Sequence, residues 1–244
     1  MSRRQNGAPG WRAETEDAPV DAAQSEAQIR AVLARLGPPP KRVLDLGCGG
    51  GRLLVPLAAA GHDIAGIDRA PEAVARCRLR LEESAARAAL QTLDFLTRPI
   101  CLGGPFDAVL CLGNTLMTVA DIDDAVELLT AVRRSLCDGG QFVIDDLPGE
   151  FWPELAEGNW QSGVSETGDL QLIWQARDAV FVLRRGEAVD PTCPRPRLGE
   201  PRLRLWTDGA LRLAARLAGL SGPHRPPRVH LLVMRRETGA HHGE

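Results

Sequence analysis

Short apolar runs alternate with longer amphipathic stretches along the first part of the chain. The apolar runs lie at 42–46, 63–67, 89–93, 106–112 and 141–144, and such short runs are typical of strands covered on both faces of a parallel sheet. Between the runs, apolar residues recur every three or four positions, which indicates helices. The helices are expected at about 21–36, 52–60, 71–81 and 121–136. This alternation predicts an α/β fold with a doubly wound, mostly parallel sheet and helices on both of its faces.

Residues that start or stop regular structure agree with this pattern. The segment Gly37–Pro40 ends the first helix, and Pro71 lies at a first-turn position of a later helix, where proline is tolerated. Asp121 is a suitable N-cap for the helix that follows it. The segment Asp138–Gly140 predicts a turn into the strand 141–144.

The regular alternation ends after the fifth strand. The stretches 170–174 and 179–183 predict two strands of a small antiparallel insert. Thr207 is the expected cap of a helix that runs to about Ala218, and 229–234 is the expected last strand. The fold class is therefore a doubly wound sheet that carries an antiparallel insert after its fifth strand.

The ends of the chain differ in composition from its centre. Residues 1–20 are polar and are expected to be disordered, and 237–244 are expected to form a flexible tail. The range 21–236 is expected to form one domain, in which 147–204 make up the insert.

The run Val43–Arg52 contains a buried strand followed by a glycine-rich turn, with Asp45 just before the first glycine and Asp68 about twenty residues on. Glycines permit positive φ angles and let a ligand lie against bare backbone, and the helix that follows offers free N–H groups. The dinucleotide fingerprint needs a third glycine where this chain has Arg52. The carboxylate of Asp45 would also face a pyrophosphate, whereas it suits a cationic amino group.

Several strands of the predicted sheet end in an acid or an amide. In such sheets, ligands bind beyond the carboxyl ends of the strands. The residues at or just past these ends are Asp45, Asp68, Asp94, Asn114, Asp145 and Asp146. The row therefore predicts a binding site at this edge, and ordinary loop polarity is the alternative.

Composition limits the binding partners and the cellular location that can be expected for this chain. The chain has 244 residues, a net charge of −3 and a pI of about 6.0, which gives no reason to expect general binding to nucleic acid or to an anionic membrane. Its 6 cysteines show no metal-ligand spacing, so no metal is expected. No secretory signal or long apolar run is present, and a cytoplasmic location is expected.

Four segments resemble motifs of the class I S-adenosylmethionine-dependent methyltransferases. Val43–Arg52 and Gly61–Asp68 look like the first two motifs of that family, while Phe106–Leu110 and Leu136–Gly140 are similar to its fourth and fifth strand motifs. The resemblance covers about 25–146 well. It implies a Rossmann-like fold, S-adenosylmethionine as cofactor and methyl transfer as the reaction, and it does not identify the substrate.

The resemblance also implies roles for individual residues. Asp45 would hold the methionine part, Asp68 would accept hydrogen bonds from both ribose hydroxyls, and Asp94 would receive the adenine amino group while Phe95 supports the ring. For Asp94, a turn cap is the alternative. The other residues assigned to the cofactor lie in the loops beside it: Gly47, Cys48, Gly49, Gly51, Arg69, Leu112 and Asn114.

Two departures from the family matter. Ala70 stands where the family often has a hydroxyl residue as helix cap. Only 220–227 separates the last helix from the last strand, and this segment holds three prolines, which rarely lie inside a sheet ladder. We expect the outer edge strand to be missing or vestigial, which would leave 229–234 as an exposed edge through which the chain could form a homodimer.

The resemblance implies that the reaction needs little from the protein beyond positioning, since the electrophile is already activated. The methyl acceptor is expected to be a small molecule with a nitrogen or oxygen nucleophile. Asp146 is the preferred candidate for a general base, with Asp145 and His230 as others, and a purely structural carboxylate is an equal alternative.

The insert is expected to cover the acceptor, because Trp152, Trp160 and Trp174 would give it aromatic walls. Core packing is the alternative for Trp174. Two other functions stay open at this point. One is a nucleotide-dependent oxidoreductase, and the other is a non-catalytic subunit that binds S-adenosylmethionine and supports a partner.

Overall fold

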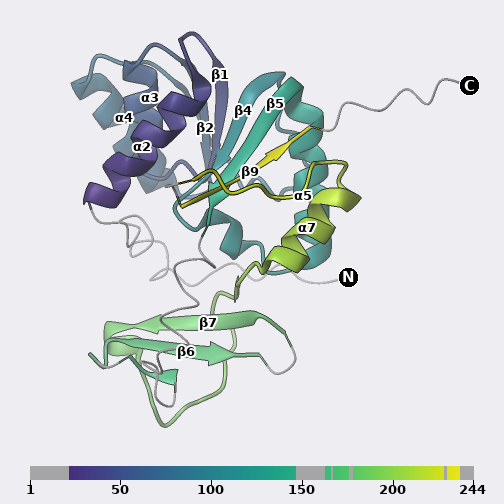
Figure 1. Cartoon of the computed structure of the whole chain (residues 1–244). Helices are drawn as coiled ribbons and strands as arrows, with labels where there is room; N and C mark the ends of the chain where they lie inside the picture. Colours follow the sequence, from purple (N-terminus) through teal and green to yellow (C-terminus); the bar gives the residue numbers. More distant parts are fainter. Residues whose placement is uncertain (1–21, 147–162, 166, 176–177, 228–229, 237–244) are drawn as a thin grey trace, which may run out of the picture.

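The computed structural model describes residues 22–146, 163–165, 167–175, 178–227 and 230–236, and its main part is a six-stranded sheet between two layers of helices (Figure 1). The strands lie in the order β3-β2-β1-β4-β5-β9. Their bounds are β1 Arg42–Leu46, β2 Asp63–Asp68, β3 Ala89–Thr92, β4 Phe106–Cys111, β5 Leu136–Asp145 and β9 Leu231–Arg235. Strands β1 to β5 pair in parallel, while β9 runs antiparallel to β5. The predicted doubly wound, mostly parallel sheet is confirmed.

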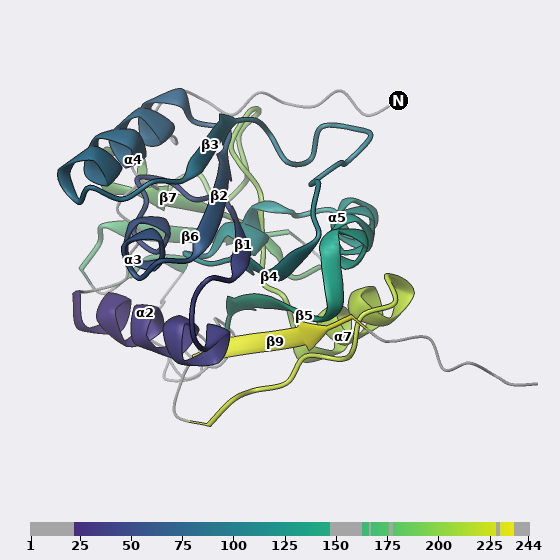
Figure 2. The same cartoon turned by 90° about the horizontal axis from the view of Figure 1, so that it is seen from above.

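Helices cover both faces of this sheet. Their bounds are α2 Ala22–Leu36, α3 Leu54–Ala59, α4 Pro71–Glu83, α5 Ile122–Ser135 and α7 Asp208–Leu217. Figure 2 shows α2, α3 and α4 on one side of the strands and α5 and α7 on the other. Side chains alternate along each strand, so Val43 packs with the first group of helices and Leu44 with the second. Among the described helices, none has the length and apolar character needed to cross a membrane.

The predicted helix starts rest on specific hydrogen bonds. Asp121 Oδ1 accepts hydrogen bonds from the backbone N–H groups of Asp123 (2.8 Å) and Asp124 (3.3 Å), which confirms it as the N-cap of α5. Thr207 caps α7 in the same way, since its side chain accepts from Ala210 N. By contrast α4 begins with Pro71 and has no side-chain cap.

The start of β5 differs from the prediction. The segment Asp138–Gly140 was expected to be a turn before the strand, but β5 already begins at Leu136 and runs through it. The pairing with β4 shifts register between Phe106 and Ala108, and Gly139 has a φ of 77°. The glycine thus forms an irregularity within the strand rather than a separate turn.

The outer side of β9 is partly covered by the chain itself. Residues 220–227 form no strand of the sheet, as expected, and contribute only isolated bridges. However, Ser221 N donates to Arg235 O at 2.8 Å, and His224 and Val233 exchange two backbone hydrogen bonds of 2.9 Å. The outer strand is therefore vestigial, as predicted. The edge of β9 is not fully exposed, because the segment pairs with it locally even though its prolines prevent a regular ladder.

The described part of the insert is a second, three-stranded antiparallel sheet in the order β6-β7-β8. Its strands are β6 Leu170–Trp174, β7 Val180–Arg185 and β8 Leu203–Arg204, and the short β8 was not predicted. Figure 1 shows this sheet beyond one end of the main sheet. It is anchored to the segment after β4, since Arg204 Nε donates to Ala120 O at 2.6 Å and Trp206 Nε1 donates to Leu116 O at 3.1 Å.

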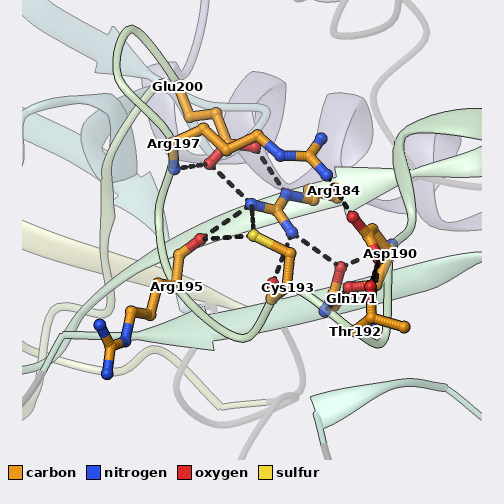
Figure 3. A network of polar contacts seen from close by, with 8 residues as sticks. All are labelled: Gln171, Arg184, Asp190, Thr192, Cys193, Arg195, Arg197 and Glu200. Carbon is orange, nitrogen blue, oxygen red and sulfur yellow. Dashed lines mark hydrogen bonds and ion pairs between the residues drawn. The ribbon is translucent and has the colours of Figure 1, made fainter.

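A buried arginine organises the long loop of the insert (Figure 3). The side chain of Arg184 is 2% exposed and forms an ion pair of 2.6 Å with Glu200. Its Nη1 donates to Cys193 O at 2.8 Å, and its Nη2 donates to Arg195 O at 2.9 Å. One side chain thereby binds two carbonyl groups of the loop.

Candidate functional site

The loops after β1 and β2 are joined by hydrogen bonds to one carboxylate. Gly49 N donates to Asp68 Oδ2 at 2.8 Å, and Ala70 N donates to Asp68 Oδ1 at 2.9 Å. Gly47 N donates to Ile67 O at 2.8 Å, which holds the glycine turn against the end of β2. A carboxylate oxygen can accept two hydrogen bonds. Each oxygen of Asp68 can therefore accept a second bond, as two neighbouring ribose hydroxyls would require.

The glycines of this turn differ in what surrounds them. Three of its glycines have positive φ angles, which are 72° at Gly47, 53° at Gly49 and 85° at Gly51. A Cβ atom on Gly47 would lie 2.5 Å from Thr115 Cγ2, and one on Gly51 would lie 2.7 Å from Cys77 Sγ. At Gly49 no heavy atom lies within 4 Å of that position. The turn is thus packed at its ends and open at its centre, where a ligand can approach the backbone.

Cys48 faces the protein core rather than the open side of the turn. It is buried, and a Cβ atom on Gly66 would lie 3.0 Å from its Sγ. The hydrogen bond with the Cys77 thiol, together with burial, raises the pKa of the Cys48 thiol above its usual range. Cys48 thus stays a neutral thiol, and only its backbone is available to a ligand.

Asp45 is a buried carboxyl group at the centre of the site. Only 2% of its surface is exposed. Burial raises its pKa to about 7; Arg52 opposes this shift, while the charges of Asp68 and Asp145 add to it. The charges of two further acidic side chains and one arginine thus act on Asp45. A cationic group would relieve this excess of negative charge.

The carboxylate of Asp145, at the end of β5, connects three parts of the chain. Its Oδ2 accepts from Asn114 N and its Oδ1 accepts from Gln28 Nε2, both at 2.8 Å. Asn114 has a φ of 63°, which turns the chain sharply after β4. Arg52 interacts favourably with Asp145 and donates to Ser25 Oγ at 3.3 Å. Helix α2 therefore contributes directly to the strand-end site.

Sequence reasoning missed Ser25 and Gln28. A signal was present, because both polar residues share the helix face that carries Val32 and Leu36, which are buried against the sheet. Polar residues on an apolar helix face need a buried partner. Their partners are far away in sequence, so the pattern alone did not name them.

The remaining candidates lie at or next to strand ends, and their cofactor roles stay predictions. Asp94 Oδ1 accepts from Leu96 N at 2.9 Å, so Asp94 does cap a turn, as the alternative proposed. Phe95 is half-buried and packs against the core under α5. Leu112 is 3% exposed directly after β4, whereas Arg69 is exposed after β2.

Asp146 lies in a charge network away from this acidic centre. Arg225 donates to it twice, from Nε to Oδ2 at 2.7 Å and from Nη2 to Oδ1 at 3.0 Å. The same guanidinium binds Asp208 in the first turn of α7. Hydrogen bonds to Asp208 and Asp146 raise the pKa of Arg225, so its guanidinium stays protonated. The role of general base stays a prediction, and this geometry favours the structural alternative.

Comparison with known proteins agrees with the motifs. The methyltransferase-domain family matches residues 43–140. A ubiquinone biosynthesis O-methyltransferase from Xanthomonas axonopodis pv. citri (strain 306) is 31% identical over 137 residues, which are 56% of this chain and 55% of that protein. The chain spans about half the length of the curated relatives it matches.

Solved structures show the same fold over most of the chain. A sugar N-methyltransferase from Streptoalloteichus sp. ATCC 53650 has a TM-score of 0.61 and 22% identity, and the match covers 98% of this chain and 96% of that one. The magnesium protoporphyrin IX methyltransferase from Synechocystis PCC 6803, solved with bound S-adenosylmethionine, has a TM-score of 0.55, 17% identity and coverages of 95% and 93%.

The geometry fits the cofactor of these proteins. The open backbone at Gly49, the doubly held carboxylate of Asp68 and the acidic centre at Asp45 suit a nucleoside joined to a cationic amino acid. Residues 43–140 of the chain therefore match the methyltransferase-domain family, and the chain has the fold of solved S-adenosylmethionine-dependent methyltransferases.

Proposed function

We propose that this chain transfers the methyl group of S-adenosylmethionine to a nitrogen or oxygen nucleophile of a small molecule. The observation that carries the proposal is the order in which carboxylate side chains follow one another along the edge of the sheet. Asp94 follows β3, and Asp68 and Asp45 lie at the ends of the neighbouring strands β2 and β1. Asp145 ends β5, two strands further on. This row of side chains offers consecutive positions for the adenine, the ribose and the cationic amino acid part of the cofactor, and then for the methyl acceptor.

In this proposal, each side chain binds one part of the cofactor. Asp68 accepts hydrogen bonds from the ribose hydroxyls, and Asp45 pairs with the amino group beside the open backbone of Gly49. Asp94 and Phe95 contact the adenine, and the backbone from Leu112 to Asn114 borders the sulfonium. When bound, the cofactor supplies a methyl group on a positively charged sulfur. The protein then contributes mainly orientation and exclusion of water.

The acceptor is proposed to be a small molecule held under the insert. Two hydrogen bonds that anchor the described strands β6 to β8 next to the segment after β4 support this position. Trp174 is partly exposed there and contacts the Phe181 ring, with the two centroids 4.9 Å apart. Trp152 and Trp160, the other predicted walls, lie outside the described residues. In this proposal the methyltransferase domain comprises residues 21–236, and residues 147–204 form the lid over the methyl acceptor.

Relatives differ in the nucleophile that they methylate. The curated relatives are ubiquinone biosynthesis O-methyltransferases, and one structural neighbour is a sugar N-methyltransferase. Both classes support a small organic acceptor, and together they leave nitrogen and oxygen open.

The proposal is tested by titration calorimetry with S-adenosylmethionine and with NAD, followed by transfer of labelled methyl to a panel of amines and hydroxyl compounds. We expect binding of S-adenosylmethionine and labelling of at least one acceptor. Binding of NAD alone would instead support an oxidoreductase. Binding of S-adenosylmethionine without any transfer would support a non-catalytic subunit.

A further inference from the structure

Gln28 carries a buried hydrogen-bond acceptor that nothing in the described chain satisfies. The residue is 7% exposed, and its Oε1 has no hydrogen-bond partner among the described residues. Its Nε2 donates to Asp145 Oδ1 at 2.8 Å. Because an ionised carboxylate only accepts hydrogen bonds, this contact fixes which end of the amide is the oxygen. Buried polar atoms normally have partners, so Oε1 is suited to a donor that arrives with a ligand.

The position of Gln28 points to the methyl acceptor rather than to the cofactor. Under the proposed function, the cofactor extends from the end of β3 across β2 to β1, where Asp45 pairs with its amino group. The sheet continues from β1 to β4 and then β5. Gln28 lies over the end of β5, where it shares Asp145 with Asn114. It therefore lies past the methionine end of the cofactor.

The charges around Gln28 favour a nitrogen donor. Two acidic side chains, Asp145 and the nearby Asp45, lie close to the cation Arg52, so among these described groups negative charge exceeds positive charge. A neutral amine keeps a lone pair for the methyl group, offers up to two N–H donors and becomes a cation when the methyl–nitrogen bond forms and the methyl–sulfur bond breaks, whereas an alcohol has one O–H. An acceptor oxygen next to a carboxylate thus suits an amino group better than a hydroxyl group.

We propose that Gln28 Oε1 accepts a hydrogen bond from the amino group of the methyl acceptor, and that the acceptor is therefore an amine. This inference rests on the proposed function, and it names the substrate class of the same site. Asp145 orients the Gln28 amide, which makes Asp145 a positioning residue.

Two stable analogues test the inference without knowledge of the acceptor. S-adenosylhomocysteine lacks the methyl group, while sinefungin carries an amino group at the point of transfer. Their dissociation constants are measured by calorimetry for the wild-type chain and for Gln28→Met, an apolar replacement of similar size. The matched control is Gln141→Met, because Gln141 is an 8% exposed amide in the middle of β5.

We expect the wild-type chain to bind sinefungin about tenfold more tightly than S-adenosylhomocysteine. Gln28→Met should lose most of this preference while it binds S-adenosylhomocysteine within about twofold of wild type, and Gln141→Met should keep the preference. The inference is overturned if Gln28→Met keeps the preference, or if both variants lose it equally. A wild-type chain that binds neither analogue would overturn the proposed function itself.

Discussion

Gly49 donates its backbone N–H to Asp68 Oδ2 at 2.8 Å, so one hydrogen bond joins the loops that follow β1 and β2. The carboxylate shapes the glycine turn from one side and faces the expected ribose from the other. Its contribution to folding and its contribution to binding can be separated by substitution.

We expect Asp68→Asn to weaken binding of S-adenosylhomocysteine at least about tenfold and to cost about 1–3 kcal/mol of unfolding free energy. The amide would place a donor opposite the N–H of either Gly49 or Ala70. The control is Asp107→Asn, because Asp107 Oδ2 accepts from Arg42 N at 2.8 Å next to the start of β1. It should lose stability but not affinity. Equal losses of affinity, measured by calorimetry, would contradict the role of Asp68.

Cofactor binding should strengthen as the pH rises towards neutrality. The folded chain holds the Asp45 pKa at about 7, well above the unfolded value near 3.9. Between these two pKa values, the folded chain keeps a proton on Asp45 that the unfolded chain has lost. The stability that this proton gives the folded state is lost as the pH rises from about 4 to 7.

A cationic amino group favours the ionised carboxylate, so affinity for S-adenosylhomocysteine should rise up to about twentyfold between pH 5.5 and 7.5. Proton release should appear as a dependence of the binding heat on the buffer. Asp45→Asn should bind weakly at every pH. A flat profile for the wild-type chain would show that Asp45 does not meet the cation.

Gly49→Ala separates backbone strain from ligand contact. The φ of 53° disfavours any side chain, yet a Cβ atom would have no protein atom within 4 Å. Gly37 has the same property at a φ of 74°, after α2 and outside the site. Both alanine variants should lose about 1 kcal/mol of stability, but only Gly49→Ala should weaken S-adenosylhomocysteine binding, by about tenfold or more. Similar affinities for the two variants would place the ligand elsewhere.

Arg184→Met should loosen the insert without affecting the cofactor loops. The change leaves Glu200 without its ion-pair partner. Removing one partner of a buried ion pair typically costs about 3–5 kcal/mol of unfolding free energy. Arg197→Met is the control, since its ion pair with Asp190 is largely exposed and should matter by less than about 1 kcal/mol. Limited proteolysis within 186–202 and thermal melting measure the difference. Equal protease sensitivity of the two variants would contradict the organising role of Arg184.

Asp146→Asn tests whether this carboxylate acts in chemistry. Because Arg225 binds both of its oxygens, we expect a loss of about 1–3 kcal/mol of stability and little change in the rate of labelled methyl transfer. Asp208→Asn, which removes the other partner of Arg225, should behave similarly. A large fall in rate for Asp146→Asn alone, at unchanged cofactor affinity, would support the general base.

The sequence was sufficient for those parts of the fold that depend on local patterns. The limits of β1 were predicted to the residue, and Asp121 and Thr207 cap helices as expected, because these features depend on alternation and on neighbouring N–H groups. The strand-end position of Asp45, Asp68 and Asp94 followed from topology alone.

Contacts between distant residues could not be predicted in this way. Gln28 and Asp145 are 117 positions apart, and Arg225 reaches Asp146 across 79 positions. The register shift that starts β5 at Leu136 and the pairing of His224 with Val233 likewise depend on neighbours brought together only by the fold. Periodicity contains no information about such partners.

Helix α2 lies outside the segment 43–140 that the family shares, yet Ser25 and Gln28 reach the charged groups at the strand ends. Substitutions in this helix can therefore change the surroundings of Asp145 while the shared loops keep their cofactor geometry. The chain encodes these two parts of the site in separate stretches, which allows one to diverge between related proteins while the other is inherited intact.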